Sequence, residues 1–462
     1  MEHLAVHTRK PCVHRSVLPL VCLFGSAFFS AFGQDRGAIA LSNVTIIEGT
    51  DNPPLKNATI VWRAGRITRV ASDQKPPKDA TVIDGAGKYV IPFLWNNDLH
   101  GPAYDEAPPL LKELVANGVT TVRDMGALLA DIVRLRDAIA AGRVFGPRLF
   151  VAGPLMEGPV PVQMGLIVDL FSATQAHEEV RKLKAQEVDY IEVDTTLTPA
   201  LYAAVADEAR RQNLPLVGHI PAIISARNIV PAGQVNVEHL GGRFLNVLIA
   251  CSTDEPYFNQ ITARTYNEIL AALREKRQAK EPQFKADFDT RLLSTFSETK
   301  AKQLYASYAQ HGIAQTPTLH VLKTLWESNK ESNGLDEEDM KLGSRIFEKD
   351  LAVIGAMKRT GVPILAGTDG PYGDGGEALH DELELLVRAG LSPLQALQAA
   401  SRDAASAMGI LKQVGTLEGK AADMVLLDAD PLADIANTRK IAGVVLGGRL
   451  FSAAELKAMR NH

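Results

Sequence analysis

The spacing of apolar and polar positions changes after residue 89. From there to about residue 411, short runs rich in β-branched and apolar residues alternate with longer stretches of helical periodicity. This alternation is typical of parallel strand–helix units. Strands are predicted at residues 90–95, 120–125, 148–153, 189–193, 215–220, 235–240, 314–319 and 363–369. Eight such units over roughly 320 residues predict an α/β fold, a (β/α)8 TIM barrel with insertions.

Helices are predicted between these strands, at residues 110–117, 128–141, 176–186 and 199–212. One connection is far longer than the others: residues 241–312 follow the sixth strand and are charged and mostly helical in pattern. They lie after a strand end, on the face where barrel active sites form. Two interpretations remain open, a surface decoration and a lid that shapes a substrate pocket.

The two ends of the chain share a different pattern. Residues 38–90 and the residues after 411 consist of short strand-like runs separated by glycine-containing turns, such as the hairpin around Gly65. We expect both ends to pair in one small β-sandwich domain. The predicted domains are a signal peptide at 1–33, β-sandwich parts at 34–92 and 412–462, and a barrel at 93–411 that includes the 241–312 insertion.

Residues 1–33 have the pattern of a signal peptide. Basic residues begin the segment, and an apolar run over 16–32 leads to small residues around Gly33. The alternative is a membrane anchor, but the run contains Pro19 and Gly25 and is short for a stable span. We therefore expect export to the periplasm or the exterior, with cleavage near Gly33 and no membrane span afterwards.

Composition narrows the functional classes. Apolar residues make up 46% of the chain and charged residues 22%, which is ordinary for a globular protein. The net charge of −5 and the absence of a basic patch argue against a nucleic-acid partner. Only Cys251 lies outside the predicted leader, so no disulfide is expected within the mature chain.

Residues that can bind metal ions follow five of the predicted strands. The carboxyl ends of barrel strands converge on one pocket, and imidazole and carboxylate groups are ligands of divalent ions. A single histidine at a strand end is usually a hydrogen-bonded structural residue, so the prediction depends on the set as a whole. The predicted ligands are Asp98, His100, Glu192, His219, His239 and Asp369.

The chain resembles a known family. Its motifs are similar to those of the amidohydrolase superfamily, in the group around imidazolonepropionase and the Xaa-Pro dipeptidases. The resemblance covers nearly everything from residue 38 to residue 451. The motifs that carry it are residues 90–95, 118–126, 146–149, 218–221, 238–240, 367–369 and 419–426. The resemblance implies the barrel fold, a metal-dependent hydrolase and self-association.

Two positions depart from the family pattern. The first strand of the family ends in His-x-His, whereas this chain has Asp98 and His100; the fourth often carries a carboxylated lysine, whereas this chain has Glu192. Three carboxylates, including Asp369, would neutralise two divalent ions that share one hydroxide. A binuclear site is thus electrostatically permitted, and Asp98 favours harder ions such as manganese. The opposite interpretation is a decayed or mononuclear site.

The resemblance implies a mechanism for cleavage of a C–N bond in an amide, a cyclic amide or a dipeptide-like substrate. One or two divalent ions, zinc or manganese, would activate water, with Asp369 as general acid and base and His239 helping to polarise the carbonyl group. The alternative is a catalytically impaired, metal-poor barrel that binds a small molecule. Three residues near strand ends are weaker candidates for substrate binding: His380, Tyr372 and His320.

Overall fold

The computed structural model describes residues 37–101, 104–158, 166–242, 244–275, 277, 285–324, 337–371 and 374–460. The predicted leader at 1–33 lies outside these ranges. No helix in the described ranges is long and apolar enough to cross a membrane.

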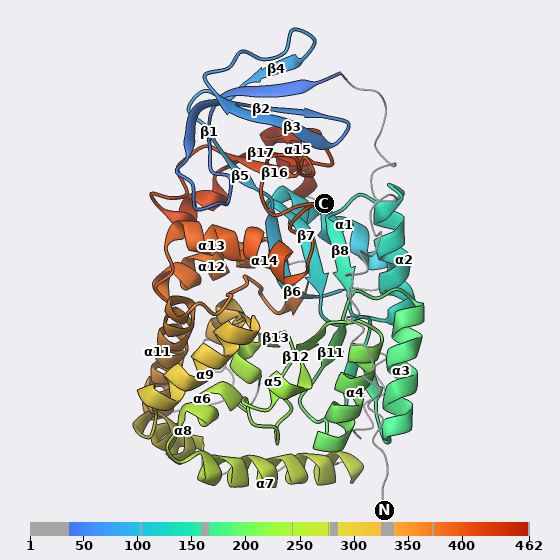
Figure 1. Cartoon of the computed structure of the whole chain (residues 1–462), viewed down its shortest axis with the longest axis vertical. Coiled ribbons are helices and arrows are strands. Elements are labelled where there is room, and N and C mark those ends of the chain that lie inside the picture. Colours follow the sequence, from blue (N-terminus) through green and yellow to red (C-terminus); the bar gives the residue numbers. More distant parts are fainter. Residues whose placement is uncertain are drawn as a thin grey trace, which may run out of the picture.

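A barrel of parallel segments lies at the centre of the molecule, where Figure 1 shows its strands with helices around them. Its strands are β6 (Leu94–His100), β7 (Val119–Asp124), β8 (Arg148–Val151), β11 (Ile191–Val193), β12 (Leu216–Gly218), β13 (Asn236–Glu238) and β14 (Ala314–Thr316). Ladders join β6–β7–β8, β11–β12 and β13–β14. Backbone hydrogen bonds of 2.8–2.9 Å close the other junctions: Asp189 N to Val151 O, Val235 N to Leu216 O, Leu365 N to Gln315 O, and Asn97 N to Ala366 O.

These contacts confirm the predicted barrel, with two adjustments. The eighth segment, predicted at 363–369, joins the ring through isolated hydrogen bonds and a bridge between Gln315 and Ile364, and its regular strand, β15 (Gly370–Pro371), comes only after these residues and pairs with β6. The first strand was predicted at 90–95, which is wrong at its start. Residues 89–92 pair with the small sheet, and the barrel strand begins at Leu94.

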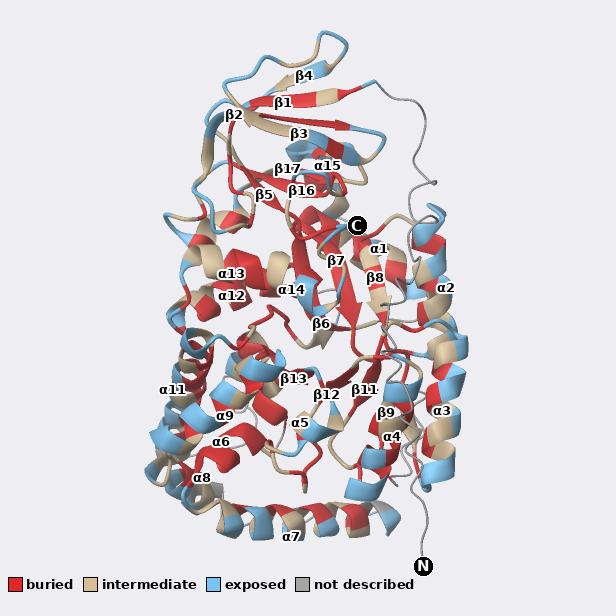
Figure 2. Cartoon of the chain, in the orientation of Figure 1, coloured by how far each residue is buried: buried red, intermediate tan, exposed pale blue. Residues whose placement is uncertain are grey.

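Helices cover the outside of the ring and carry their apolar faces inward (Figure 2). Thr198 and Ser392 cap their helices with side-chain oxygens and are followed by proline, as helix starts require. The helices with described bounds are α1 (Ala107–Ala116), α2 (Leu129–Ala140), α3 (Ala173–Ala185), α4 (Pro199–Arg211), α5 (Ile229–Ala232), α11 (Glu337–Thr360), α12 (Gly375–Arg388), α13 (Pro393–Ala399), α14 (Arg402–Ala407) and α15 (Ala453–Arg460).

The long connection after the sixth strand is helical, as predicted. It contains α6 (Asn246–Cys251), α7 (Glu255–Arg274), α8 (Lys285–Ser294) and α9 (Glu298–His311). Helix α7 lies at the end of the molecule opposite the small sheet (Figure 1). The hydroxyl of Tyr266 on α7 donates a 2.8 Å hydrogen bond to the carbonyl oxygen of Thr196, in the loop after β11. The insertion therefore contacts a loop at the carboxyl end of the barrel strands.

Both ends of the chain join in one eight-stranded sheet. Its path is β18-β17-β16-β5-β1-β2-β3, with β4 paired to β1. The apolar side chains of this sheet, which include Trp62, Met424 and Val445, pack together in a separate core. The strands are β1 (Ile39–Ile46), β2 (Leu55–Arg63), β3 (Arg66–Ser72), β4 (Thr81–Asp84), β5 (Tyr89–Pro92), β16 (Met424–Leu427), β17 (Ile441–Leu446) and β18 (Arg449–Ser452).

Candidate metal centre

Three side chains from three different strand ends meet at the carboxyl face of the barrel. One ligand atom each from Asp98, His239 and Asp369 lies within 4.8 Å of the others. Nε2 of His239 is 3.7 Å from Oδ2 of Asp98 and 3.6 Å from Oδ2 of Asp369. These separations are too long for hydrogen bonds. They match the roughly 3.4–3.7 Å between two atoms that bind one ion at about 2.1 Å.

Two further predicted ligands border this cluster. Nε2 of His100 is 3.0 Å from Oδ1 of Asp369. The rings of His219 and His239 lie edge to face with centroids 5.0 Å apart. Among the described residues, the group whose ligand atoms could share one ion is Asp98, His239 and Asp369, and His100 and His219 lie beside it.

Glu192, the sixth predicted ligand, points into the barrel interior with 4% of its surface exposed. Its Oε2 and Oδ2 of Asp98 are buried and find no hydrogen-bond partner in the described part of the chain. Burial is the main cause that raises the pKa of Glu192 well above its usual range, and repulsion by Asp98 and Glu238 adds to it. Burial likewise raises the pKa of Asp98 well above its usual range, with repulsion by Asp369 as the next cause. Buried carboxylates without partners are costly, and a bound cation would compensate them; the residues present therefore fit a divalent ion.

A hydrogen bond sets the tautomer of His239. The hydroxyl of Thr318 donates to the carbonyl oxygen of Pro317 at 2.8 Å, so the same hydroxyl oxygen accepts from Nδ1 of His239 at 2.5 Å. The proton then lies on Nδ1, and Nε2 turns a lone pair toward the two carboxylates. Burial lowers the pKa of His239 to about 4, which keeps the ring neutral. In this tautomer Nε2 has no proton to polarise a carbonyl group, so the geometry suits a ligand.

His219 is oriented in a comparable way by a residue that sequence reasoning left without a role. Oδ1 of Asp194 lies 2.6 Å from its Nδ1, and the backbone N–H and hydroxyl of Thr195 donate to the same carboxylate. Burial opposes the charged ring, but Asp194 prevails and raises the pKa of His219 to about 9. At neutral pH the ring therefore carries protons on both nitrogens, and an ion at Nε2 would displace the proton there, while Asp194 keeps the proton on Nδ1, as in the carboxylate–histidine arrangements that support metal ligands.

The backbone is strained where these side chains meet. His239, Thr318 and Asp369 have φ values of 51°, 48° and 50°, in the left-handed region that favours glycine. For a β-branched residue such as Thr318 this conformation is exceptional. Such strain of about 1–3 kcal/mol per residue concentrates at functional sites.

Glycines allow the strand ends to approach one another. A Cβ at Gly218, just before His219, would lie 2.2 Å from the carbonyl oxygen of Val193. A Cβ at Gly367 would lie 2.7 Å from Cβ of Asp98. The close spacing of the ligands thus depends on side chains being absent at these two positions.

The structure does not bring the weaker candidates into this cluster. His380 is buried, and its ring nitrogens contact the backbone oxygen of Asn117 and the hydroxyl of Thr438. Since Asn117 precedes β7, His380 lies toward the opposite end of the strands, with both nitrogens engaged. Nδ1 of His320 lies 3.2 Å from Asp381 on α12. Tyr372 lies outside the described residues.

Exposure distinguishes the two carboxylates of the cluster. The side chain of Asp369 is 27% exposed and that of Asp98 only 2%. Burial opposes ionisation, but the hydrogen bond and charge of His100, with the charge of His219, hold the pKa of Asp369 below its usual value. Asp369 is therefore the ionised carboxylate that solvent or a substrate can reach.

Comparisons with known proteins agree with this picture. The sequence model of the amidohydrolase family matches residues 103–242 and 276–451, more than half of the chain. A search of curated protein sequences finds no significant match.

Solved structures share the fold across nearly the whole chain. A Xaa-Pro dipeptidase with methionine bound in its active site is 18% identical, with a TM-score of 0.67 over 90% of this chain and 100% of that one. A protein from Bifidobacterium longum, provisionally assigned as a prolidase, is 25% identical, with a TM-score of 0.65 over 93% and 99%. Bottromycin amidohydrolase is 18% identical, with a TM-score of 0.68 over 94% and 91%.

Proposed function

The chain belongs to the amidohydrolase family, and from that premise we propose that it is a metal-dependent hydrolase of C–N bonds in small amide, cyclic-amide or dipeptide-like substrates. The observation that carries the proposal is the spacing of Asp98, His239 and Asp369, which is that of ligands and not of hydrogen-bonded groups. Two of the structurally similar proteins are named for dipeptide and amide chemistry.

The proposed ligands of the ion are Asp98, His239 and Asp369, with His219 and Glu192 completing one or two sites. His100, whose Nε2 contacts Asp369, orients that ligand. Zinc and manganese suit this mixture of imidazole and carboxylate groups. When bound, such an ion lowers the pKa of water and polarises a carbonyl group.

The chain's own residues then move the proton. Asp369, ionised and partly exposed, takes a proton from the attacking water at Oδ1 or Oδ2 and gives it to the nitrogen of the leaving amine. His100 donates to Oδ1 at 3.0 Å and so holds the carboxylate in place. Asp98 stays buried beneath them and takes no part in this transfer.

The sequence pattern of residues 1–33 supports export as part of the proposal. Amino-terminal sequencing of secreted material tests it: a mature chain that begins near Gln34 is expected, and an uncleaved chain would contradict export by this route.

A substrate panel tests the catalytic proposal. Dipeptides, cyclic imides and lactones are assayed with the full chain in added zinc or manganese, and again after removal of the ion by a chelator. Hydrolysis of at least one C–N substrate that disappears with the chelator and returns with the ion is expected. If the chain binds a panel compound without cleaving it under any of these conditions, the alternative of a binding protein is favoured.

A further inference from the structure

The barrel interior holds a fully buried ion pair that the mechanism does not use. Arg123 on β7 donates to Oε1 of Glu238 at 2.6 Å, and both side chains are at most 2% exposed. A buried ion pair rarely stabilises a fold more than apolar residues of the same volume would, because of the cost of removing both charges from water. Stability alone therefore does not account for the pair.

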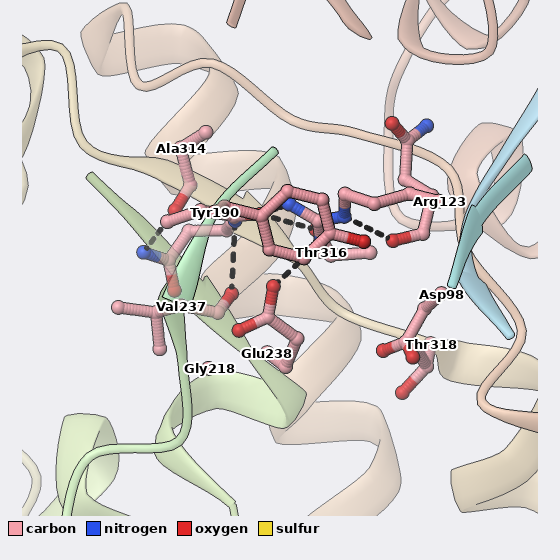
Figure 3. A network of polar contacts seen from close by, with 12 residues as sticks. Asp98, Arg123, Tyr190, Gly218, Val237, Glu238, Ala314, Thr316 and Thr318 are labelled. Carbon is pink, nitrogen blue, oxygen red and sulfur yellow. Dashed lines mark hydrogen bonds and ion pairs between the residues drawn. The ribbon is translucent and has the colours of Figure 1, made fainter. Parts of the chain in front are cut away.

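Arg123 reaches three other strands from inside the ring (Figure 3). Its Nε donates to the carbonyl oxygen of Asn97 on β6 at 2.6 Å. Its Nη1 donates to Asn236 on β13, and its Nη2 contacts Thr316 on β14 at 3.2 Å. The planar fork of arginine fixes the directions of these donors relative to one another.

The positions that Arg123 holds come just before the residues of the metal centre. Asn97 precedes Asp98, and Glu238 precedes His239. Thr316 comes two residues before Thr318, which sets the tautomer of His239. One guanidinium group thus fixes the strand ends that supply Asp98 and His239, whose ligand atoms lie 3.7 Å apart, and the strand end that orients His239.

The charge of the pair matters as well. Oε2 of Glu238 is buried and finds no hydrogen-bond partner in the described ranges. With Arg123 present, the charge of Glu238 is neutralised, and the remaining buried carboxylates of Asp98 and Glu192 are left for a cation.

We propose that Arg123, paired with Glu238, is the positioning residue of the metal centre: it fixes β6, β13 and β14 so that Asp98 and His239 meet one ion. This inference rests on the proposed function. It assigns Arg123 no contact with substrate.

Cobalt(II) binding tests the inference, because its absorption spectrum reports the geometry of the ligands as well as the affinity. In Arg123→Lys the charge remains but the fork is lost. We expect cobalt to bind about 10–100-fold more weakly, as for other residues that orient ligands, with an altered spectrum. Arg148→Lys is the matched control, because Arg148 also lies on a barrel strand and pairs with a buried acidic residue, Asp423, at 3.3 Å. It should bind cobalt as the unaltered chain does.

Circular dichroism in chelator shows whether each variant folds without the ion. Should Arg123→Lys not fold, Glu238→Gln takes its place: it keeps an acceptor for Arg123 and removes the compensating charge, so weaker cobalt binding is again expected. Cobalt affinity and spectrum unchanged in the folded variant would overturn the inference. Failure of the unaltered chain to bind cobalt, zinc or manganese would instead refute the proposed function, and this inference with it.

Discussion

Replacing Thr318 with valine removes the one group that fixes the tautomer of His239. Valine keeps the shape and β-branch of threonine, so the strained backbone at φ 48° is unchanged. The hydroxyl is fully buried, and its loss leaves the Nδ1–H of His239 without an acceptor. The proton can then move to Nε2, where it would occupy the lone pair that a metal ion needs.

The size of the effect follows from the cost of an unpaired buried donor, about 1–3 kcal/mol. At about 1.36 kcal/mol per factor of ten, this is roughly a 5- to 160-fold loss of metal affinity. Residues that orient metal-binding histidines typically contribute 10–100-fold. Both figures agree on a loss of about 10–100-fold for Thr318→Val.

Competition with a chromophoric chelator measures zinc or manganese affinity directly. Thr318→Ser is the matched control, because serine keeps the hydroxyl and loses only a methyl group; it should stay within a few-fold of the unaltered chain. Thermal unfolding in chelator verifies that both variants fold without the ion. Equal affinities of the valine and serine variants would refute the assignment of the tautomer, and with it the role of Thr318.

Three other predictions follow from the site and its surroundings. Asp369→Asn should lower turnover at least about 100-fold while at least half of the metal content remains; a rate near that of the unaltered chain would rule out the acid–base role. Asp98→His should shift selectivity from manganese toward zinc, and unchanged selectivity in a competition assay would show that Asp98 is no ligand. Burial, then Arg439, lowers the pKa of His380 to about 3 from 6.5, so its neutral form stabilises the fold fully above pH 6.5 and loses this contribution as the pH falls toward 3. Urea unfolding between pH 7 and 4 should show the unaltered chain losing up to about 1.4 kcal/mol per pH unit more than His380→Gln, and parallel losses would contradict the shift.

The alternation of strands and helices was enough to predict the barrel, because each unit repeats the same switch from a short apolar run to a stretch with helical spacing of apolar residues. The predicted strand at 90–95 nevertheless crossed the boundary between β5 and β6, although the predicted domain boundary after residue 92 falls there. Residues 89–95 form one continuous apolar run, and only the pairing of β5 with β16 shows that its first part belongs to the small sheet. The eighth segment was found from its sequence pattern, although few hydrogen bonds hold it.

The cluster of ligands could be predicted because the ends of parallel strands must meet, whatever lies between them in sequence. The residues that orient the ligands could not. Thr318 lies 79 residues from His239, and Arg123 lies 115 residues from Glu238. No local sequence pattern predicts such pairs: Arg123 stands beside Asp124 in a strand that also carries two threonines. The substrate-binding prediction for His380 rested on its place soon after a strand end, and α12 turns that side chain toward the other end of the barrel.

A crystal of the full chain grown with manganese or zinc shows whether the three strand ends bind an ion. An anomalous difference peak is expected about 2.0–2.3 Å from Oδ2 of Asp98, Nε2 of His239 and Oδ2 of Asp369. No peak among these three atoms, at saturating metal, would contradict the proposed metal centre.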